Sequence, residues 1–370
     1  MTPQETPPAP TPPDRPPPGR IAAQARRLSL LNGLFEFRAL IALAVLIVLF
    51  GMLTDSFLTV PNLIRTAEHI AVNGVVALGM LLVILKGGID LSVGSVIGLS
   101  GVVAGELLGG LDLRFVDVIA YPPAWGVIVL CVAVGMLVGL VNGVLVTRFG
   151  VAPFIATFGM LYVARGLALL ISGGSTYTDL DGSPQLGNTG FGLLGNTRPL
   201  GIPTSIWIMI ALAVAVMLAL ARTPFGRWLY AAGGNERAAE LSGVPINRVK
   251  TVVYVISGAC AALAGLLIAS ELTVATPQAG ETFELNAIAA VILGGATLNG
   301  GRGTVRGTLI GAIVIGLLVS GLLLLDVSLF WQILIKGALI IFVVLLDQGQ
   351  QRLRRHRAAV SALVTAGRPD

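Results

Sequence analysis

Charged side chains are scarce in this chain, which indicates whether it folds in water or in a membrane. Asp, Glu, Lys and Arg make up 12% of its 370 residues, about half the share of an ordinary soluble domain. A water-soluble protein of this length needs more polar surface than these charges supply. The apolar residues, 55% of the chain, gather instead in runs of roughly 17 to 25 residues that match the hydrocarbon thickness of a bilayer. The composition therefore predicts an all-α polytopic membrane protein.

Lysine is rarer still, and its positions exclude a nucleotide site of the usual kind. The lysines are Lys86, Lys250 and Lys336, and none of them follows a glycine. The Gly-x-x-x-x-Gly-Lys-Ser/Thr loop that cradles phosphates is therefore missing. We expect no ATP hydrolysis by this chain through that route.

Histidine and cysteine are equally few, which excludes most metal and nucleophile chemistry. His69 and His356 are far apart, and the chain has neither a His-Glu-x-x-His motif nor a Cys-His cluster. Cys131 and Cys260 stand singly in apolar runs, which favours buried small side chains over a disulfide or a metal site. The sequence predicts no catalytic residue, no metal and no cofactor in this chain; an intramembrane enzyme that works through carboxylates is the minor alternative.

Both ends of the chain differ from its apolar middle. Residues 1–37 are Pro-rich and polar, so we expect a disordered tail without a cleavable signal. Residues 348–370 form a basic tail. Between them, residues 38–347 form the transmembrane domain. Arginines before the first span and in the last tail place both termini in the cytoplasm by the positive-inside rule.

Ten apolar runs are long enough, or nearly so, to cross a bilayer. The loop 222–250 carries several basic residues and the loop 172–202 only Arg198, so the first is expected in the cytoplasm and the second outside. The second run is slightly short and the eighth clearly short, so nine or eleven spans are the alternatives. The predicted spans are 38–57, 70–85, 92–108, 124–147, 153–171, 203–221, 250–270, 285–294, 304–325 and 329–346.

A Gly-rich, polar stretch, LKGGIDLSVGSVIGLSG, interrupts the apolar sequence at residues 85–101. Gly87 and Gly88 break helical periodicity, and Asp90 or Ser92 can cap a helix that restarts beyond them. Such a broken helix at membrane depth is typical of a transport pathway. The alternative is a tight cytoplasmic turn in which Lys86 and Asp90 are solvated.

A second stretch, LGGATLNGGRGTVRGTLIGA at 293–312, repeats the pattern of a Gly-Gly pair before a glycine-spaced helix. Gly87 and Gly294 are separated by about half the chain, which suggests an internal, parallel repeat. Close helix packing at Gly303, Gly307 and Gly311 is the simpler explanation of their spacing.

The loop 222–250 is predicted to contain a short capped helix. Asn235 can cap residues 236–242, and Gly243 before Val244-Pro245 ends them. Because two turns do not hold themselves in water, this helix needs a partner surface. A separate ATPase that applies force here suits a chain without its own nucleotide site.

Four separated motifs resemble one family of membrane proteins over about residues 38–347. GGIDLSVGSVIGLSGVV, GVAPFIATFGMLYVARGLALLISGG, GRWLYAAGGNERAAELSGVPINRVK and LNAIAAVILGGATLNGGRGTVRGTLIGA are similar, in order, to the permease of bacterial ABC importers of the ribose/xylose/arabinose type. The resemblance implies a fold similar to the vitamin B12 importer permease. It also implies a second permease subunit, expected as a homodimer, a cytoplasmic ATPase that binds ATP-Mg, and a periplasmic or extracellular sugar-binding protein. Nucleic acid is not among the expected partners, and the expected location is the bacterial inner membrane.

The resemblance and the motifs described above together give the candidate residues. The sugar itself is left open, with a nucleoside, a signalling furanose or a polyol as the alternatives. The candidate ATPase-coupling residues are Gly233, Gly234, Asn235, Glu236, Ala239, Glu240, Leu241 and Gly243. The candidate pathway or hinge residues are Gly87, Gly88, Asp90, Ser92, Gly94, Gly294, Gly295 and Asn299.

Ionisable residues inside the spans provide the last expectations. Arg165, Lys336 and Glu106 are expected to pair or to snorkel, because unpaired charge in the bilayer costs about 2.5 to 3.5 kcal/mol. An ion-driven carrier is the rival class. It needs coupling carboxylates near the midplane, for which only Asp90 and Glu284 qualify, both near span ends.

Overall fold

The computed structural model describes residues 38–113, 118–328, 330–342, 344–345 and 348–349. Contacts divide the chain into two compact units, Met1–Arg38 and Ala39–Asp370. The predicted tail 1–37 and nearly all of the predicted basic tail 348–370 lie outside the described residues, so both stay predictions. The second unit holds the features described below.

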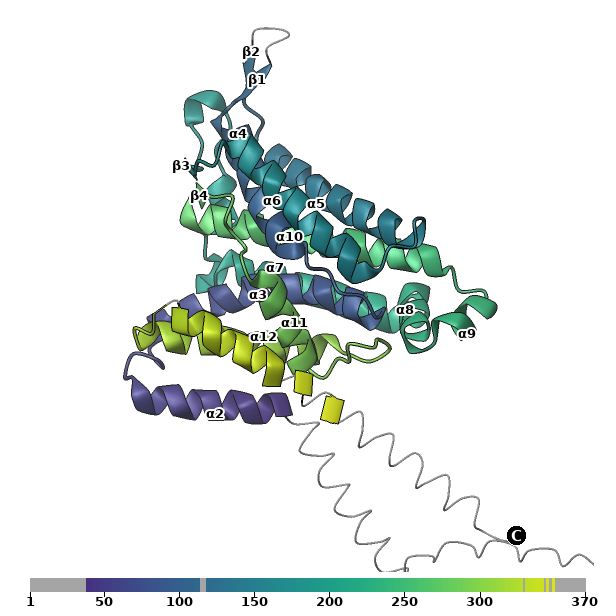
Figure 1. Ribbon diagram of the computed structural model, residues 1–370. Helices are drawn as coiled ribbons and strands as arrows, with labels where there is room; N and C mark the ends of the chain where they lie inside the picture. Colours follow the sequence, from purple (N-terminus) through teal and green to yellow (C-terminus); the bar gives the residue numbers. More distant parts are fainter. Residues whose placement is uncertain (1–37, 114–117, 329, 343, 346–347, 350–370) are drawn as a thin grey trace, which may run out of the picture. The chain divides into compact units, whose positions relative to one another are not determined.

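Almost every described element of this unit is a helix (Figure 1). The helices are α2 (Arg38–Leu53), α3 (Val60–Leu85), α4 (Val93–Gly109), α5 (Ala124–Thr147), α6 (Pro153–Ser172), α7 (Thr204–Arg222), α8 (Pro224–Gly234), α9 (Glu236–Leu241), α10 (Ile246–Leu272), α11 (Phe283–Leu293) and α12 (Val305–Leu324). An apolar helix at Phe330–Phe342 follows them.

Two small antiparallel strand pairs and three short 3-10 helices complete the described part of the unit. Strand β1 (Leu111–Leu113) pairs with β2 (Val118–Ala120), and β3 (Tyr177–Thr178) pairs with β4 (Val274–Ala275), with Tyr177 opposite Ala275. The 3-10 helices η1 (Pro184–Leu186), η2 (Phe191–Leu193) and η3 (Pro199–Gly201) lie in the connection before α7.

The predicted membrane spans correspond to described helices. Six helices are long and apolar enough to cross a bilayer, namely α3, α5, α6, α7, α10 and α12, and four shorter apolar helices accompany them. This confirms the all-α polytopic architecture. The eighth predicted span, at 285–294, is indeed short, because α11 has only 11 residues.

The second span was predicted too short. We placed it at 70–85, whereas α3 begins at Val60 and has 26 residues. Pro61 lies in its first turn, where proline favours the start of a helix. Glu68, two turns farther along this helix, has a charged partner outside it, since Arg198 Nη2 lies 3.2 Å from Glu68 Oε1.

Helices α3 and α10 form the centre of the bundle. In their most apolar windows 83% and 67% of residues are buried, against 33%, 28% and 22% in α5, α6 and α7. Glycines let α10 approach α5 closely, since a Cβ at Gly135 or Gly139 would overlap the backbone at Gly258 or Tyr254. The apolar side chains that α5, α6 and α7 expose are the surface a bilayer covers.

Candidate functional site

Three segments that are far apart in the sequence meet at one end of the bundle. The amide of Gly301 donates to the carbonyl of Leu85 over 2.8 Å. A Cβ at Gly300 would lie 2.9 Å from both Gly87 N and Gly233 O. We call this meeting of Leu85–Gly88, Gly233–Glu236 and Asn299–Gly301 the junction.

Glycine is required where the junction is tightest. A Cβ at Gly233 would overlap the Leu85 carbonyl and approach Gly301 N to 2.6 Å. Gly87 has φ +85, in the left-handed region that favours glycine, and a Cβ there would lie 3.4 Å from the Asn299 carbonyl oxygen. Glycines just after α3, at the end of α8 and within the α11–α12 connection therefore permit this close backbone contact.

A charged triad joins the junction to α9 and α10. Glu236 Oε2 accepts from Lys86 Nζ at 2.7 Å, and Glu236 Oε1 accepts from Lys250 Nζ at 2.6 Å. Burial lowers the pKa of Lys86, and its hydrogen bond to Glu236 opposes that shift. Partial burial raises the pKa of Glu236, but the two lysines outweigh it and hold the pKa below its ordinary value. One carboxylate thus connects α9 with the end of α3.

The predicted capped helix in the loop 222–250 is present as α9, preceded by α8. Asn235 Oδ1 accepts from the amide of Ala238 at 3.0 Å, and Gly243 follows the helix with φ +84. Both the cap and the glycine stop agree with the sequence-based prediction for this loop. Helix α8, which the sequence analysis did not separate, adds Gly233 and Gly234 to the junction.

Helix α9 has an inward and an outward face. Ala239 is buried with Ala232 and Ile246, so it holds the helix to its own chain and contributes no outward surface. Leu241 is 78% exposed, and Arg237 and Glu240 are exposed beside it. The outward face combines one large apolar side chain with charges of both signs.

The polar interruption between α3 and α4 is buried, so the solvated-turn alternative is wrong. Asp90 is 1% exposed and Lys86 8%. Asp90 Oδ1 accepts from the amide and the hydroxyl of Ser92 at 3.0 and 2.6 Å, and Asp90 Oδ2 accepts from the Ser257 hydroxyl at 2.8 Å. Asn142 donates to Ser92 Oγ at 2.9 Å. These bonds anchor the break to α5 and α10.

Asp90, rather than Ser92, organises the start of α4. Ser92 occupies the N-cap position but its side chain makes no capping bond. Gly94, in the first turn of α4, lies against Glu284 and the Gly280 carbonyl. The break therefore touches the connection that leads into α11 as well as the junction.

The second Gly-rich segment lies beside the first at the same end of the bundle. Gly294 packs against the backbone of Gly307, and Gly311 packs against Ala290, which confirms close packing of α11 and α12 at Gly307 and Gly311. Gly303 lies before α12 and faces Ala296 and Leu81 instead. Gly295 has φ +96 and Asn299 lies at the junction. The internal repeat itself stays a prediction.

Two of the three ionisable residues predicted inside the spans have partners. The guanidinium of Arg165 donates to the carbonyls of Pro277 and Ala279, and Glu106 accepts from the Tyr177 hydroxyl at 2.5 Å. Lys336 makes no ion pair with a described residue. Within the described part of the chain, no three His, Cys, Asp or Glu side chains gather to hold a metal ion.

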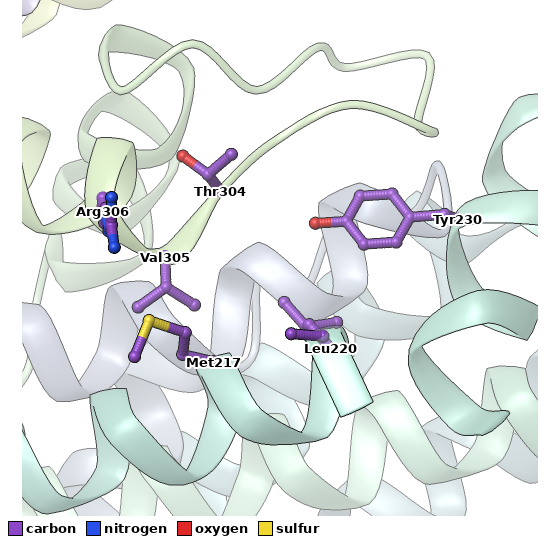
Figure 2. A pocket seen from close by; sticks show the side chains of 7 residues that line it. Met217, Leu220, Tyr230, Thr304, Val305 and Arg306 are labelled. Atoms are coloured by element: carbon purple, nitrogen blue, oxygen red, sulfur yellow. The ribbon is translucent and has the colours of Figure 1, made fainter. Parts of the chain in front are cut away.

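A hollow of about 430 Å³ opens next to the junction (Figure 2). Met217, Leu220 and Ala221 of α7 line one side, Tyr230 of α8 another, and Thr304, Val305 and Arg306 the third. The Tyr230 hydroxyl is already used, since it donates to the Gly303 carbonyl at 2.8 Å. With mainly apolar walls, this hollow does not suit a ligand rich in hydroxyl groups.

Several contacts of the site escaped the sequence analysis. The pairing of Lys86 and Lys250 with one carboxylate was not predicted, because their shared partner Glu236 is 150 residues from Lys86. Ser257 and Asn142 lie in apolar runs, where a single polar residue carries no visible pattern. The one feature of the sequence that could have identified them is a polar residue within a membrane span, since such a residue favours a hydrogen bond to a neighbouring helix.

Comparison with known proteins identifies the family. The family model described as "Branched-chain amino acid transport system / permease component" matches residues 62–344. The Ribose import permease protein RbsC of Escherichia coli strain K12 is 41% identical over 319 residues, 86% of this chain and 95% of that protein. RbsC of Bacillus subtilis strain 168 is 43% identical, over 83% and 91%.

A more distant relative has the same role in its name. The L-arabinose ABC transporter permease protein AraH of Azospirillum brasilense is 35% identical, over 84% of this chain and 88% of that protein. No solved structure matches, so the likeness to the vitamin B12 importer permease stays a prediction. The chain belongs to the permease family of ABC importers, as a multi-pass membrane transport component and not an enzyme.

Proposed function

We propose that this permease carries a monosaccharide of the pentose class. The support is the similarity to proteins named for ribose at 41% and 43% identity and for arabinose at 35%, each over more than four fifths of this chain. The family description names branched-chain amino acids, which makes leucine the rival substrate to test. Nucleosides, signalling furanoses and polyols are the further competitors.

The coupling part of the proposal rests on one observation, the ion pair that joins α9 to the junction. Leu241, Glu240 and Arg237 present an exposed face, while Glu236 on the same short helix binds Lys86 at the end of α3. A partner that pushes on α9 therefore pushes on the break between α3 and α4. We infer that this face docks a cytoplasmic ATPase, which binds ATP-Mg and supplies the energy.

The candidate coupling residues have four tasks in this proposal. Gly233 and Gly234 keep α8 against Leu85 and Gly301, and Asn235 and Gly243 bound α9. Glu240 and Leu241 make the outward contact, while Ala239 holds α9 from within. The break residues Gly87, Gly88, Asp90, Ser92 and Gly94 act as the hinge that receives the movement.

The remaining assembly follows from this arrangement. Because α9 docks a cytoplasmic ATPase, the junction end of the bundle faces the cytoplasm of the inner membrane, as the arginine count requires. The opposite end then receives the sugar from an external binding protein. A second copy of this chain completes the membrane pathway.

Uptake in intact cells tests the substrate. In cells that lack their own pentose importers, this chain is expressed with its ATPase and binding protein, and entry of labelled ribose is measured. We expect uptake that unlabelled ribose, arabinose or xylose reduces and that leucine, adenosine and glycerol leave unchanged. Competition by leucine or adenosine alone would overturn the monosaccharide assignment.

A further inference from the structure

The connection between α10 and α11 returns into the depth of the bundle. Helix α10 ends at Leu272, and β4 pairs there with β3 at the end of the bundle opposite the junction. Helix α11 has 11 residues and finishes against α12 near the junction. Its length is about 16 Å, half of a hydrocarbon core of about 30 Å. Residues 276–282 therefore descend from the outer end to about half depth.

Arg165 independently places this segment at the same depth. On α6, Thr157 contacts the Ile89 carbonyl beside the α3–α4 break at 3.1 Å. Arg165 lies two helical turns beyond Thr157, roughly 12 Å farther from the junction. Its guanidinium donates to the Ala279 carbonyl at 3.0 Å and also to Pro277. These bonds satisfy backbone carbonyls that have no helix to pair with.

The outer face of this segment is polar. Gln278 and Glu281 are exposed, and Glu284 in the first turn of α11 is partly exposed. At a similar depth α5 and α6 expose apolar residues, Leu137 by 59% and Val163 by 53%. Lipid can cover the apolar surface of α5 and α6. It does not suit the segment 276–282, because exposed carboxylates and amides at this depth require water or polar partners.

We propose that residues 276–282, held by Arg165, form a water-exposed wall of the translocation pathway, where Gln278 and Glu281 contact the hydroxyl groups of the passing sugar. The carboxylate of Glu281 accepts hydrogen bonds from neighbouring hydroxyls. Gln278 Oε1 already accepts from the Thr276 hydroxyl at 2.6 Å, so the Gln278 amide offers mainly its two N–H donors to the sugar. So few contacts bind a polyhydroxylated solute weakly, as passage requires. The contact with sugar rests on the proposed substrate class, whereas the water-exposed wall does not.

Arg165 is a positioning residue in this arrangement. Its donors are occupied by the carbonyls of Pro277, Ala279 and, at 3.5 Å, Gly94. It lies close enough to Glu281 and Glu284 to balance their charge. Arg165 thus fixes the wall against α4 without contacting the solute.

Cysteine labelling in the assembled transporter tests the wall. The natural cysteines, Cys131 and Cys260, are both buried, so the background is low. The variants Gln278→Cys and Glu281→Cys, with Val163→Cys and Leu137→Cys as controls at matched depth, are reconstituted with the ATPase and binding protein in liposomes. A membrane-impermeant, positively charged methanethiosulfonate is applied in resting and ATP-driven states.

We expect the Gln278→Cys and Glu281→Cys variants to react at least tenfold faster than both controls, and millimolar ribose to slow that reaction severalfold. Reaction as slow as in the controls would mean that lipid or the second subunit covers this face, and would overturn the wall. Fast reaction that ribose leaves unchanged would overturn the solute contact alone. If the wild-type protein does not take up ribose, the substrate proposal fails, but the labelling rates of the wall and control cysteines can still be compared. The substrate proposal and the water-exposed wall therefore fail separately.

Discussion

Glu236 on α9 and Lys86 at the end of α3 form an ion pair of 2.7 Å across 150 residues of sequence. Lys86 is 6% exposed at its side chain and Glu236 is 48% exposed. The pair therefore reaches from a buried helix end to a surface helix. It gives the exposed face of α9 a direct mechanical connection to the broken helix behind it.

Removing the carboxylate of this pair should destabilise the permease. In Glu236→Gln, Lys86 is left buried without its countercharge. We expect a loss of about 1 to 2 kcal/mol, below the roughly 3 to 5 kcal/mol of a fully buried pair because Glu236 is half exposed. Thermal unfolding in detergent measures it. The double variant Lys86→Met/Glu236→Gln should recover most of the loss, whereas equal losses in both would contradict the pairing.

The exposed pair on the same helix provides the matched control. Arg237 Nη1 and Glu240 Oε2 are 3.7 Å apart, with side chains 82% and 61% exposed. Such surface pairs contribute about 0 to 1 kcal/mol. Replacing both with alanine should leave the unfolding temperature unchanged. A large drop would show that any charged pair on α9 stabilises the fold, and not specifically the pair of Glu236 with Lys86.

The two faces of α9 should respond differently to substitution. Leu241→Asp and Glu240→Arg change only the outward face, so we expect normal insertion and stability, loss of ATPase co-purification and loss of uptake. Ala239→Trp overfills the inward face and should lower stability by about 1 to 3 kcal/mol. Co-purification with unchanged uptake in Leu241→Asp and Glu240→Arg would rule out this docking surface.

Gly88 should tolerate no branched side chain. A Cβ there would lie 2.7 Å from the Tyr254 hydroxyl and 3.2 Å from Val83 Cγ1. Gly88→Val should therefore abolish transport or assembly. Gly88→Ala should also reduce uptake, and adding Tyr254→Phe to Gly88→Ala should restore part of it, because the hydroxyl that the new Cβ would meet is then gone. Full transport by Gly88→Val at normal membrane abundance would show that the contact is not needed.

Reporter fusions test the orientation. The excess of arginine in the loop 222–250 over the loop 172–202 predicts that a reporter after Pro245 is active only in the cytoplasm and one near Gly187 only outside. The reverse pattern would place α9 outside the cell and remove the ATPase from the proposal.

The sequence was sufficient for features that depend on neighbouring residues. Apolar runs located the spans because a bilayer demands continuous length, and Asn235 with Gly243 located α9 because caps are local. The sequence-based prediction began α3 too late because Glu68 reads as an unpaired charge. Its partner, Arg198, lies 130 residues away in the sequence.

The junction and the buried network could not be derived in the same way. Nothing local in the sequence indicates that Gly301 donates to Leu85, or that Asp90 meets Ser257 on α10. The family resemblance assigns Ala239 to the ATPase contact, but its side chain lies on the inward face of the helix. Contacts between distant segments require the packed bundle before they can be assigned.

The rate of ATP-driven ribose uptake into liposomes tests the central claim most directly. The permease is reconstituted with its ATPase, ATP is supplied on the side that α9 faces, and the loaded binding protein is added on the other. We predict uptake only when ATP, ATPase and binding protein are all present, and its loss in Leu241→Asp. Equal uptake without the ATPase, driven by an ion gradient, would contradict the account.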